Sequence, residues 1–296
     1  MKESKTINGL MDDPRLHARV KIENYLLVHL KLRPCSQTTF PTELPDGDAL
    51  GAAIDERIYP LMSSIGAVAD PRKRLTVIDG VKKEMRAAFK EIVEASDRYR
   101  AHLKWTEALG LRSLRVEVRP TIQELYLFKD KEVAKRLKRL MKEREKLRRQ
   151  ALRRPSPNLG RVQLAYPGEF KSRWLREMGG LLGYPSCCVD RYASEREHGV
   201  SVEKREAQQI REAEQRGAVD PFTYFVGYFF PCSPYCDKAL SRGREYHERL
   251  RGLDPSLGKV YMSIVSENLD HIRRQPEIIA EYKTKLIEAS PRRGAR

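Results

Sequence analysis

The sequence predicts an α+β protein, with a mostly helical N-terminal region, a short β-hairpin, a long basic helix and a C-terminal α+β domain that carries four cysteines. Apolar residues at helical spacing predict the N-terminal helices. Apolar and charged residues alternate over 114–118, which predicts a strand because successive strand side chains point to opposite faces. Residues 129–152 contain no glycine or proline, which predicts an uninterrupted helix.

The clearest change in composition is the segment Pro155–Gly160, which reads Pro-Ser-Pro-Asn-Leu-Gly and is typical of a linker. A chain of 296 residues is long enough for one large domain or for two smaller ones. We therefore expect three parts: an N-terminal region at 1–128, the basic helix and linker at 129–160, and the cysteine domain at 161–296.

The N-terminal region starts with a dense apolar segment, residues 14–32, which fits either one helix or a helix followed by a strand. A helix is expected over residues 49–62, and Pro60 should break its end. A second helix is expected over residues 79–99. Its partner in a helical hairpin should then stop at Gly110.

The hairpin and the basic helix follow each other in the sequence. Residues 114–118 and 122–128 flank a Pro-Thr turn, so we expect them to pair as two strands. The helix at 129–152 has a narrow apolar seam that Arg144 interrupts, and we expect the seam to pack on a neighbouring element. The seam consists of Val133, Leu137, Leu140 and Leu147.

The net charge of +16 is concentrated in this helix, because residues 129–154 contain thirteen Lys and Arg against four Asp and Glu. Local positive charge is typical of a surface that binds a polyanion, most simply nucleic acid. A solvated helix face is the alternative interpretation. The side chains that we expect to bind the phosphates of RNA, with tRNA as one candidate, are Lys135, Arg136, Lys138, Arg139, Lys142, Arg148 and Arg149.

The C-terminal part is expected to mix strands and helices. A strand is expected at residues 161–166, and the aromatic segment 221–230 predicts a buried central strand. The helix at 202–216 is polar nearly all round and should face solvent. The expected helices span residues 169–178, 187–198, 202–216, 236–250, 260–272 and 276–287.

Four of the five cysteines lie in two short windows, each with proline and serine just ahead of an expected helix. In the first window Ser186 is the expected N-cap, so Cys187 and Cys188 would be the first two helical residues. In the second window Ser233 is the expected N-cap and Cys236 falls in the first turn. Free N–H groups at the start of a helix favour thiolates. We therefore expect folding to bring the two pairs into one site.

Four thiolates can complete a tetrahedral Zn²⁺ site or hold a [4Fe–4S] cluster. Adjacent cysteines diverge by about 100° on a helix, which separate irons tolerate more readily than one small ion, so iron–sulfur is slightly preferred. A dithiol–disulfide pair and simple buried cysteines are the alternatives. No histidine lies within a turn of any cysteine. The expected metal ligands are Cys187, Cys188, Cys232 and Cys236.

The remaining candidates are weaker. Cys35 is expected to be a lone packed cysteine, with a spare ligand or a reactive thiol as the alternatives. Asp190, Arg191 and Tyr184 are near enough to the cysteines to be substrate contacts. Helix-dipole compensation, a surface ion pair and packing, respectively, also account for them.

The Gly-Tyr-Pro-x-Cys-Cys motif at 183–188, followed by an apolar stretch and the Pro-Cys-Ser-x-x-Cys motif at 231–236, resembles an uncharacterised prokaryotic family, domain of unknown function number 483. The resemblance covers roughly residues 174–250. It implies that the four cysteines belong together, and it implies no reaction. The family often carries a histidine before Pro-Cys, where this chain has Phe230.

The sequence therefore favours a metalloprotein that binds RNA, with RNA modification as a candidate activity and no catalytic residue that can be named. The alternatives are a non-catalytic nucleic-acid-binding module with structural zinc and a small-molecule redox or sulfur-transfer enzyme. The first twenty residues are polar, and the apolar run at 224–230 is too short to span a bilayer. We therefore expect a cytoplasmic protein with reduced cysteines and no membrane partner.

Overall fold

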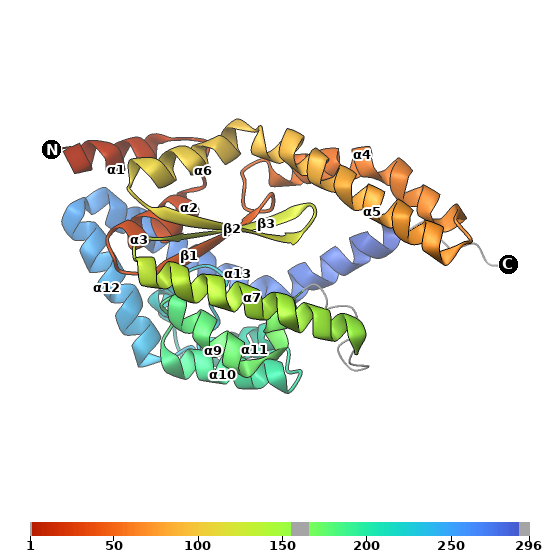
Figure 1. Ribbon diagram of the computed structural model, residues 1–296. Coiled ribbons are helices and arrows are strands. Elements are labelled where there is room, and N and C mark those ends of the chain that lie inside the picture. Colours follow the sequence, from red (N-terminus) through yellow and green to blue (C-terminus); the bar gives the residue numbers. More distant parts are fainter. Residues whose placement is uncertain (1, 155–165, 290–296) are drawn as a thin grey trace. The chain divides into compact units, whose positions relative to one another are not determined.

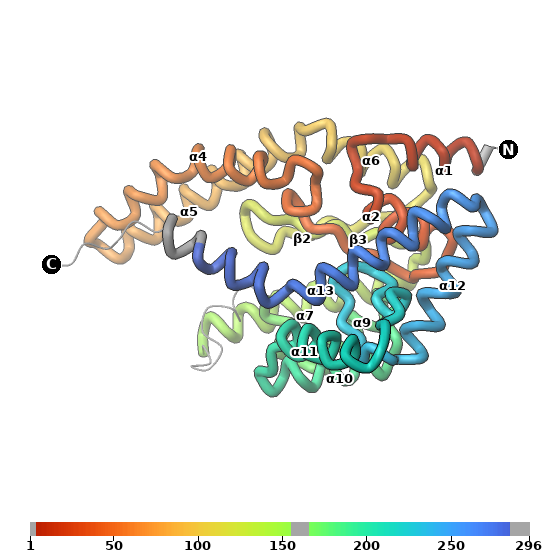
Figure 2. The backbone as a smooth tube through the Cα atoms, turned by 180° about the vertical axis from the view of Figure 1, so that it is seen from behind, coloured from red at the N-terminus to blue at the C-terminus, as the bar shows by residue number. Residues whose placement is uncertain are grey.

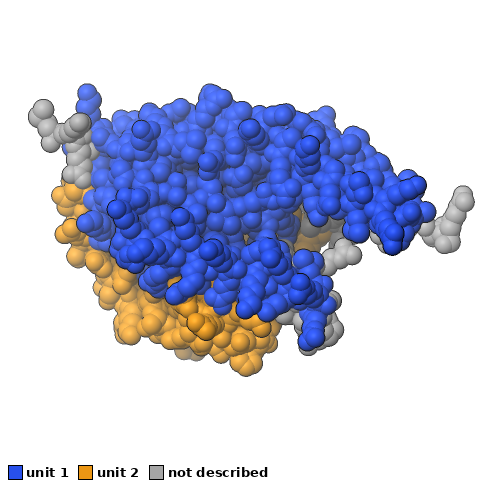
Figure 3. All heavy atoms as spheres, in the orientation of Figure 1, with its two compact units in different colours: residues 1–166, 181–183 blue, residues 167–180, 184–296 orange. Residues whose placement is uncertain are grey.

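The computed structural model describes residues 2–154 and 166–289 (Figure 1). The chain divides into two compact units, coloured separately in Figure 3. Unit 1 contains Met1–Tyr166 and Leu181–Gly183, and unit 2 contains Pro167–Gly180 and Tyr184–Arg296. The expected linker at 155–160 and all but the last residue of the expected strand at 161–166 lie outside the described residues.

Unit 1 contains a three-stranded antiparallel sheet in the order β1-β3-β2. Its strands are β1 (Cys35–Phe40), β2 (Arg112–Arg119) and β3 (Ile122–Phe128). The predicted hairpin is therefore confirmed as β2 and β3, and the α+β class is confirmed for the protein. Strand β1 was not predicted, because its six residues are mostly small and polar and give no clear alternation.

The first elements of unit 1 are short helical segments. They are α1 (Lys2–Asp12), α2 (Ala18–Val20), the π-helical η1 (Lys21–Leu26) and α3 (Leu27–His29). The apolar segment 14–32, which fitted two interpretations, thus forms helix and no strand. All six residues of η1 are buried, which accounts for the loss of a one-sided apolar pattern.

The next helices of unit 1 differ from the expected bounds. They are α4 (Gly47–Ala67), α5 (Pro71–Ala88), η2 (Phe89–Glu94) and α6 (Asp97–Ala108). Pro60 lies inside α4 on its exposed side, where water can bond the carbonyl that proline leaves free. Helix α5 begins eight residues earlier than expected, because the side chain of Asp70 accepts hydrogen bonds from the N–H groups of Arg72 and Lys73.

The basic helix is α7 (Lys131–Arg153), as expected to within two residues. Its buried side includes Arg144, the residue that interrupts the apolar seam. Arg144 is paired at 2.7 Å with Glu124 of β3, and the hydroxyl of Tyr126 donates to the same carboxylate at 2.8 Å. The interruption is therefore a buried ion pair that fixes α7 to the sheet.

The described secondary structure of unit 2 consists of helices joined by loops. Its elements are η3 (Pro167–Phe170), α9 (Ser172–Leu181), α10 (Ser186–Glu197), α11 (Val202–Glu214), η4 (Pro221–Tyr224), α12 (Asp237–Leu253) and α13 (Pro255–Ala289). The prediction of a strand at 221–230 is wrong. Asp220 caps the short 3₁₀ helix η4, and Tyr228 has a left-handed backbone, φ 59°, which lies outside the β region of a regular strand.

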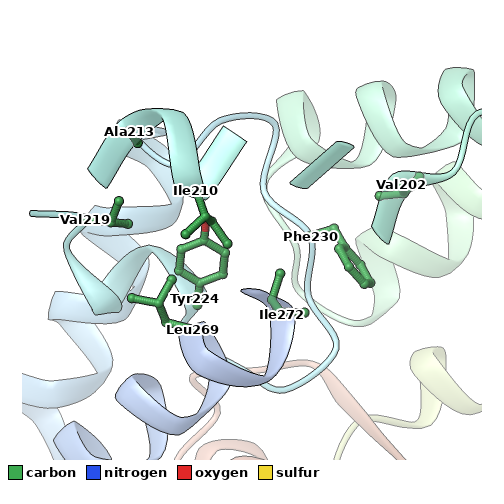
Figure 4. Packing of buried hydrophobic residues seen from close by; sticks show 8 residues of the cluster. All are labelled: Val202, Ile210, Ala213, Val219, Tyr224, Phe230, Leu269 and Ile272. Carbon is green, nitrogen blue, oxygen red and sulfur yellow. The ribbon is translucent and has the colours of Figure 1, made fainter. Parts of the chain in front are cut away.

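Two helices of unit 2 correct the expectations. Helix α11 is amphipathic, and its buried face contributes to the apolar cluster of Figure 4, so the prediction of a solvent-facing helix is wrong. Helix α13 is one helix, seen along its length in Figure 2, where two helices were expected. Proline removes one helical hydrogen bond and can bend a helix without ending it, and Pro276 lies inside α13.

The cluster of Figure 4 holds the centre of unit 2 together. It combines side chains from α11, η4 and α13 with Val219 of the loop between α11 and η4 and with Phe230, the residue just before Pro231. Phe230 also stacks on Tyr192 of α10, with ring centroids 6.2 Å apart. This apolar anchor holds the start of the second cysteine window in the core. No helix in the described part of the chain is both long and apolar enough to cross a membrane.

Candidate metal centre

The first pair of cysteines lies at the start of α10, as predicted. The helix begins at Ser186, and the residue that occupies the N-cap is Pro185, so the expected N-cap is one residue too late. The carbonyl of Pro185 accepts hydrogen bonds from the N–H groups of Cys188 and Val189, both at 3.0 Å. Cys187 and Cys188 therefore lie in the first turn, where N–H groups without helical partners favour negative charge.

The second pair lies just before α12 and differs from the prediction in its cap. Ser233 forms a local turn: its hydroxyl accepts from the N–H of Tyr235 at 3.1 Å and its carbonyl accepts from the N–H of Cys236 at 3.0 Å. Cys236 itself is the N-cap of α12, which begins at Asp237. Cys232 is in the loop ahead of this turn. One thiol of the pair is thus at a helix start and the other is on a loop.

Folding brings the two pairs together. The four Sγ atoms all lie within 4.8 Å of one another, and no histidine or carboxylate belongs to this group in the described chain. Cys236 Sγ lies 3.6 Å from Cys188 Sγ and 3.7 Å from Cys187 Sγ, and the adjacent Cys187 and Cys188 sulfurs are 3.9 Å apart. A tetrahedral ion with metal–sulfur bonds of about 2.3 Å places its sulfurs about 3.8 Å apart. The arrangement is compatible with a metal site.

The surroundings of Cys188, Cys232 and Cys236 shift the pKa values of these thiols in different directions. Burial raises the pKa of Cys188, and burial with the hydrogen bond to Cys236 raises the pKa of Cys232 to about 11. Burial opposes ionisation of Cys236 too, but the Ala239 N–H and the three neighbouring thiols lower its pKa below the ordinary value. Of these three thiols, Cys236 is the one that its surroundings favour as a thiolate.

Two arginines hold the loop that carries Cys232. Arg191 of α10 donates to the carbonyl oxygen of Cys232, and its Nε donates to Glu195 at 2.8 Å. Arg205 of α11 donates to the carbonyl oxygen of Pro231 at 3.0 Å and is paired with Glu195 at 2.9 Å. Arg191 therefore contacts the backbone of a candidate ligand.

The other two candidate substrate contacts have partners in the structure. The ring of Tyr184 packs against those of Phe229 and Phe225, with centroids 4.9 Å and 6.4 Å away. Asp190 accepts a hydrogen bond at 2.8 Å from Arg176 of α9, in an exposed ion pair. Packing and an ion pair account for both side chains.

The candidate phosphate-binding side chains follow α7 within unit 1. Six of them are exposed: Lys135, Arg136, Lys138, Arg139, Lys142 and Arg149. Arg148 is less accessible, because it is paired with Glu145 at 3.1 Å and donates to the carbonyl of Val118 at 3.2 Å. Lys135 is paired with Glu132 at 2.6 Å. The exposed members form a one-sided basic face on α7, with Arg148 at its edge.

Cys35 is separate from the four-cysteine group. It lies in β1 of unit 1 with no exposed surface, and burial raises the pKa of its thiol to about 12. It is a lone packed cysteine, as expected.

Sequence reasoning missed Arg205 and Glu195 as supports of the site. Arg205 and Pro231 are 26 residues apart, and nothing in the local pattern of α11 distinguishes this arginine from its neighbours. A weak signal existed for Glu195, since Arg191 and Glu195 have the four-residue spacing of a helical ion pair.

Comparison with known proteins identifies a family of unknown function. Residues 113–254 match the model of a family described as "Protein of unknown function (DUF483)", so the resemblance stated from the two motifs is confirmed. The match is wider than the expected 174–250 and also includes the β2–β3 hairpin and α7. No curated protein matches the chain, and no solved structure matches it.

Proposed function

We propose that this chain, whose residues 113–254 match the DUF483 family, binds one tetrahedral metal ion, Zn²⁺, through its four clustered cysteines and binds RNA through the basic face of α7. The observation that carries the metal proposal is the sulfur geometry: the Sγ–Sγ distances among Cys187, Cys188 and Cys236 are 3.6 Å, 3.7 Å and 3.9 Å, and Cys232 Sγ lies within 4.8 Å of these three sulfurs. The first three distances agree with the spacing of about 3.8 Å around one Zn²⁺ ion.

The same distances bear on the iron–sulfur alternative. In a [4Fe–4S] cluster each thiolate binds a different iron at a separate corner, so its sulfurs lie farther apart than the ligands of one ion. The adjacent thiols also converge, although side-by-side positions on a helix led us to expect divergence. Zinc is therefore our first choice, and a cluster is the competing outcome of the test below.

Four protein ligands also bear on the kind of function. Catalytic zinc sites keep an open position for water or substrate, whereas four-cysteine sites are closed and stabilise the fold. This favours a binding module with structural zinc over RNA modification, redox or sulfur-transfer chemistry. Free thiols persist in a reducing compartment, so we also propose that the protein is cytoplasmic.

The first test is metal analysis of protein purified without oxygen. We expect about one zinc per chain and no acid-labile sulfide, because one ion fits the four sulfurs. Cys188→Ser should lose the metal, and Cys35→Ser is the matched control, since both side chains are buried and only one lies in the site. Brown protein that contains iron and sulfide would show that the cysteines hold an iron–sulfur cluster and not zinc. Equal metal content in both variants would overturn the proposal that the four cysteines bind the metal.

The RNA proposal is supported by the exposed side chains of α7 and by their concentrated charge. Binding to tRNA should weaken steeply with salt, since each neutralised phosphate releases counterions. We expect the combined change of Arg136, Lys138, Arg139 and Lys142 to Gln to lower the affinity. It should also flatten the dependence of log affinity on log salt, by about 0.7–0.9 for each phosphate that the variant no longer neutralises.

The control for this experiment removes the same charge from another surface of unit 1. Arg72, Lys73, Lys83 and Lys90 are exposed and lie on α5 and η2. Their replacement by Gln lowers the net charge equally and should leave the salt slope nearly unchanged. Equal losses of affinity in the two variants would mean that net charge alone attracts RNA and that α7 is no specific surface.

A further inference from the structure

We propose that Arg191 and Arg205 are positioning residues for the metal centre: together they hold the Pro231–Cys232 backbone against α10 and α11 and thereby set the metal affinity. This inference rests on the proposed metal-binding function. Neither side chain is proposed as a ligand. Each acts through the carbonyl groups of the loop that presents the Cys232 sulfur.

The contacts show two consecutive carbonyl groups held by two different helices. Arg191, on α10, donates to the carbonyl of Cys232. Arg205, on α11, donates to the carbonyl of Pro231 at 3.0 Å. The guanidinium group has a rigid fork of donors, so each arginine can hold the loop and a carboxylate at once.

Glu195 joins the two arginines. It accepts from Arg191 Nε at 2.8 Å through Oε1 and from Arg205 at 2.9 Å through Oε2. Glu206 is also paired with Arg205, and the Tyr224 hydroxyl donates to Glu206 at 2.7 Å. Within the described structure each arginine that holds the loop is therefore also paired with a carboxyl group.

Burial makes this arrangement selective for one geometry. The side chain of Arg205 is 12% exposed, that of Glu195 is 14% exposed and that of Glu206 is fully buried. For these three groups water is therefore a poor substitute for a missing partner, and their hydrogen bonds strengthen in the low dielectric surroundings. A loop fixed by such a network does not need to be ordered by the metal.

The position of Arg191 in the sequence links the two halves of the site. It lies three residues after Cys188 on α10. The helix that carries one pair of cysteines therefore also fixes the backbone of a third cysteine, Cys232. When the thiolates already converge before the metal binds, the metal has less ordering to impose. The affinity of the site for the metal is therefore higher. Groups that orient metal ligands typically change affinity 10–100-fold when they are removed.

The test measures zinc affinity by competition with a chromophoric chelator under reducing conditions, and ligand geometry from the absorption of the Co²⁺-substituted protein. Arg191→Gln and Arg205→Gln should each lower zinc affinity on the order of 10–100-fold with all four cysteines kept. Arg205→Lys keeps the charge but lacks the fork, so it should recover only part of the affinity.

Arg196→Gln is the matched control. Arg196 is also on α10 and is 20% exposed, but it is paired with Glu203 and donates to the Tyr192 hydroxyl, and in the described structure it makes no hydrogen bond to the Pro231 or Cys232 backbone. It should lower stability without changing zinc affinity or the Co²⁺ spectrum. Should Arg205→Gln fail to fold, Arg191→Gln decides, because its side chain is 38% exposed.

The two proposals fail in different ways. Wild-type affinity in both arginine variants, with stability lowered as in Arg196→Gln, would overturn the positioning role and leave the metal site intact. Wild-type protein that binds neither zinc nor Co²⁺ would overturn the metal site itself.

Discussion

His102 is a fully buried histidine in α6 of unit 1. Its Nδ1 lies 2.9 Å from the Tyr25 hydroxyl, and its Nε2 has no hydrogen-bond partner in the described structure. Burial, with a smaller effect from His17, lowers the pKa of His102 to about 3. The folded protein therefore contains the neutral ring and strongly disfavours its protonation.

This burial predicts a loss of stability in acid. The unfolded chain protonates His102 at its ordinary pKa of about 6.5, whereas the folded chain resists protonation down to about 3. Between these values the free energy of unfolding should fall by about 1.4 kcal/mol for each unit of decreasing pH. Chemical denaturation from pH 7 to pH 4 measures the slope for wild type and for His102→Gln.

The variant should show a shallower slope, because glutamine does not titrate. His198→Gln removes an exposed histidine and should keep the wild-type slope. Identical slopes for all three proteins would show that His102 is not the group that responds to pH.

At the scale of elements, η4 and α12 approach so closely that a side chain cannot fit between them. A Cβ on Gly243 of α12 would lie 2.1 Å from the carbonyl oxygen of Phe222. A Cβ on Gly252 of the same helix would have no neighbour within 4 Å. The two glycines thus have the same backbone role but different surroundings.

These positions predict opposite effects of alanine. Gly243→Ala should destabilise the protein by about 1–3 kcal/mol, because the backbone of η4 must move away. Gly252→Ala should stabilise it by up to about 1 kcal/mol, since alanine favours helix and nothing opposes the methyl group. Thermal or urea unfolding measures both changes. A neutral Gly243→Ala would mean that η4 and α12 separate easily.

The elements show which local signals were sufficient. The β2–β3 hairpin and α7 were predictable. The alternation of apolar and charged residues in a strand and a long run of helix-forming residues are both local patterns, which the neighbouring sequence contains in full. The segment 221–230 was misassigned because a 3₁₀ turn and a left-handed residue bury most of its aromatic side chains as a strand would, although Tyr228 is half exposed. Burial alone does not distinguish these backbones.

At the scale of the whole molecule, the candidate site was half predictable. Proline and serine ahead of each cysteine pair placed Cys187, Cys188 and Cys236 close to helix starts, and the structure brings all four sulfurs together. The supports of the loop were not predictable. Arg205 and Glu206 acquire their roles from interactions with residues 18 to 26 positions away, which only the folded chain defines.

The segment Leu181–Gly183 has a consequence for how this chain can be divided. It belongs to unit 1, where Arg33 donates to the Leu182 carbonyl at 3.3 Å and a Cβ on Gly183 would meet Pro34 at 2.9 Å. Its flanks on both sides belong to unit 2. A fragment that starts at Pro167 would keep every cysteine of the metal centre but would leave these three residues without Arg33 and Pro34. Expression of the cysteine region alone therefore removes the packing partners of the segment immediately upstream of its first two sulfurs.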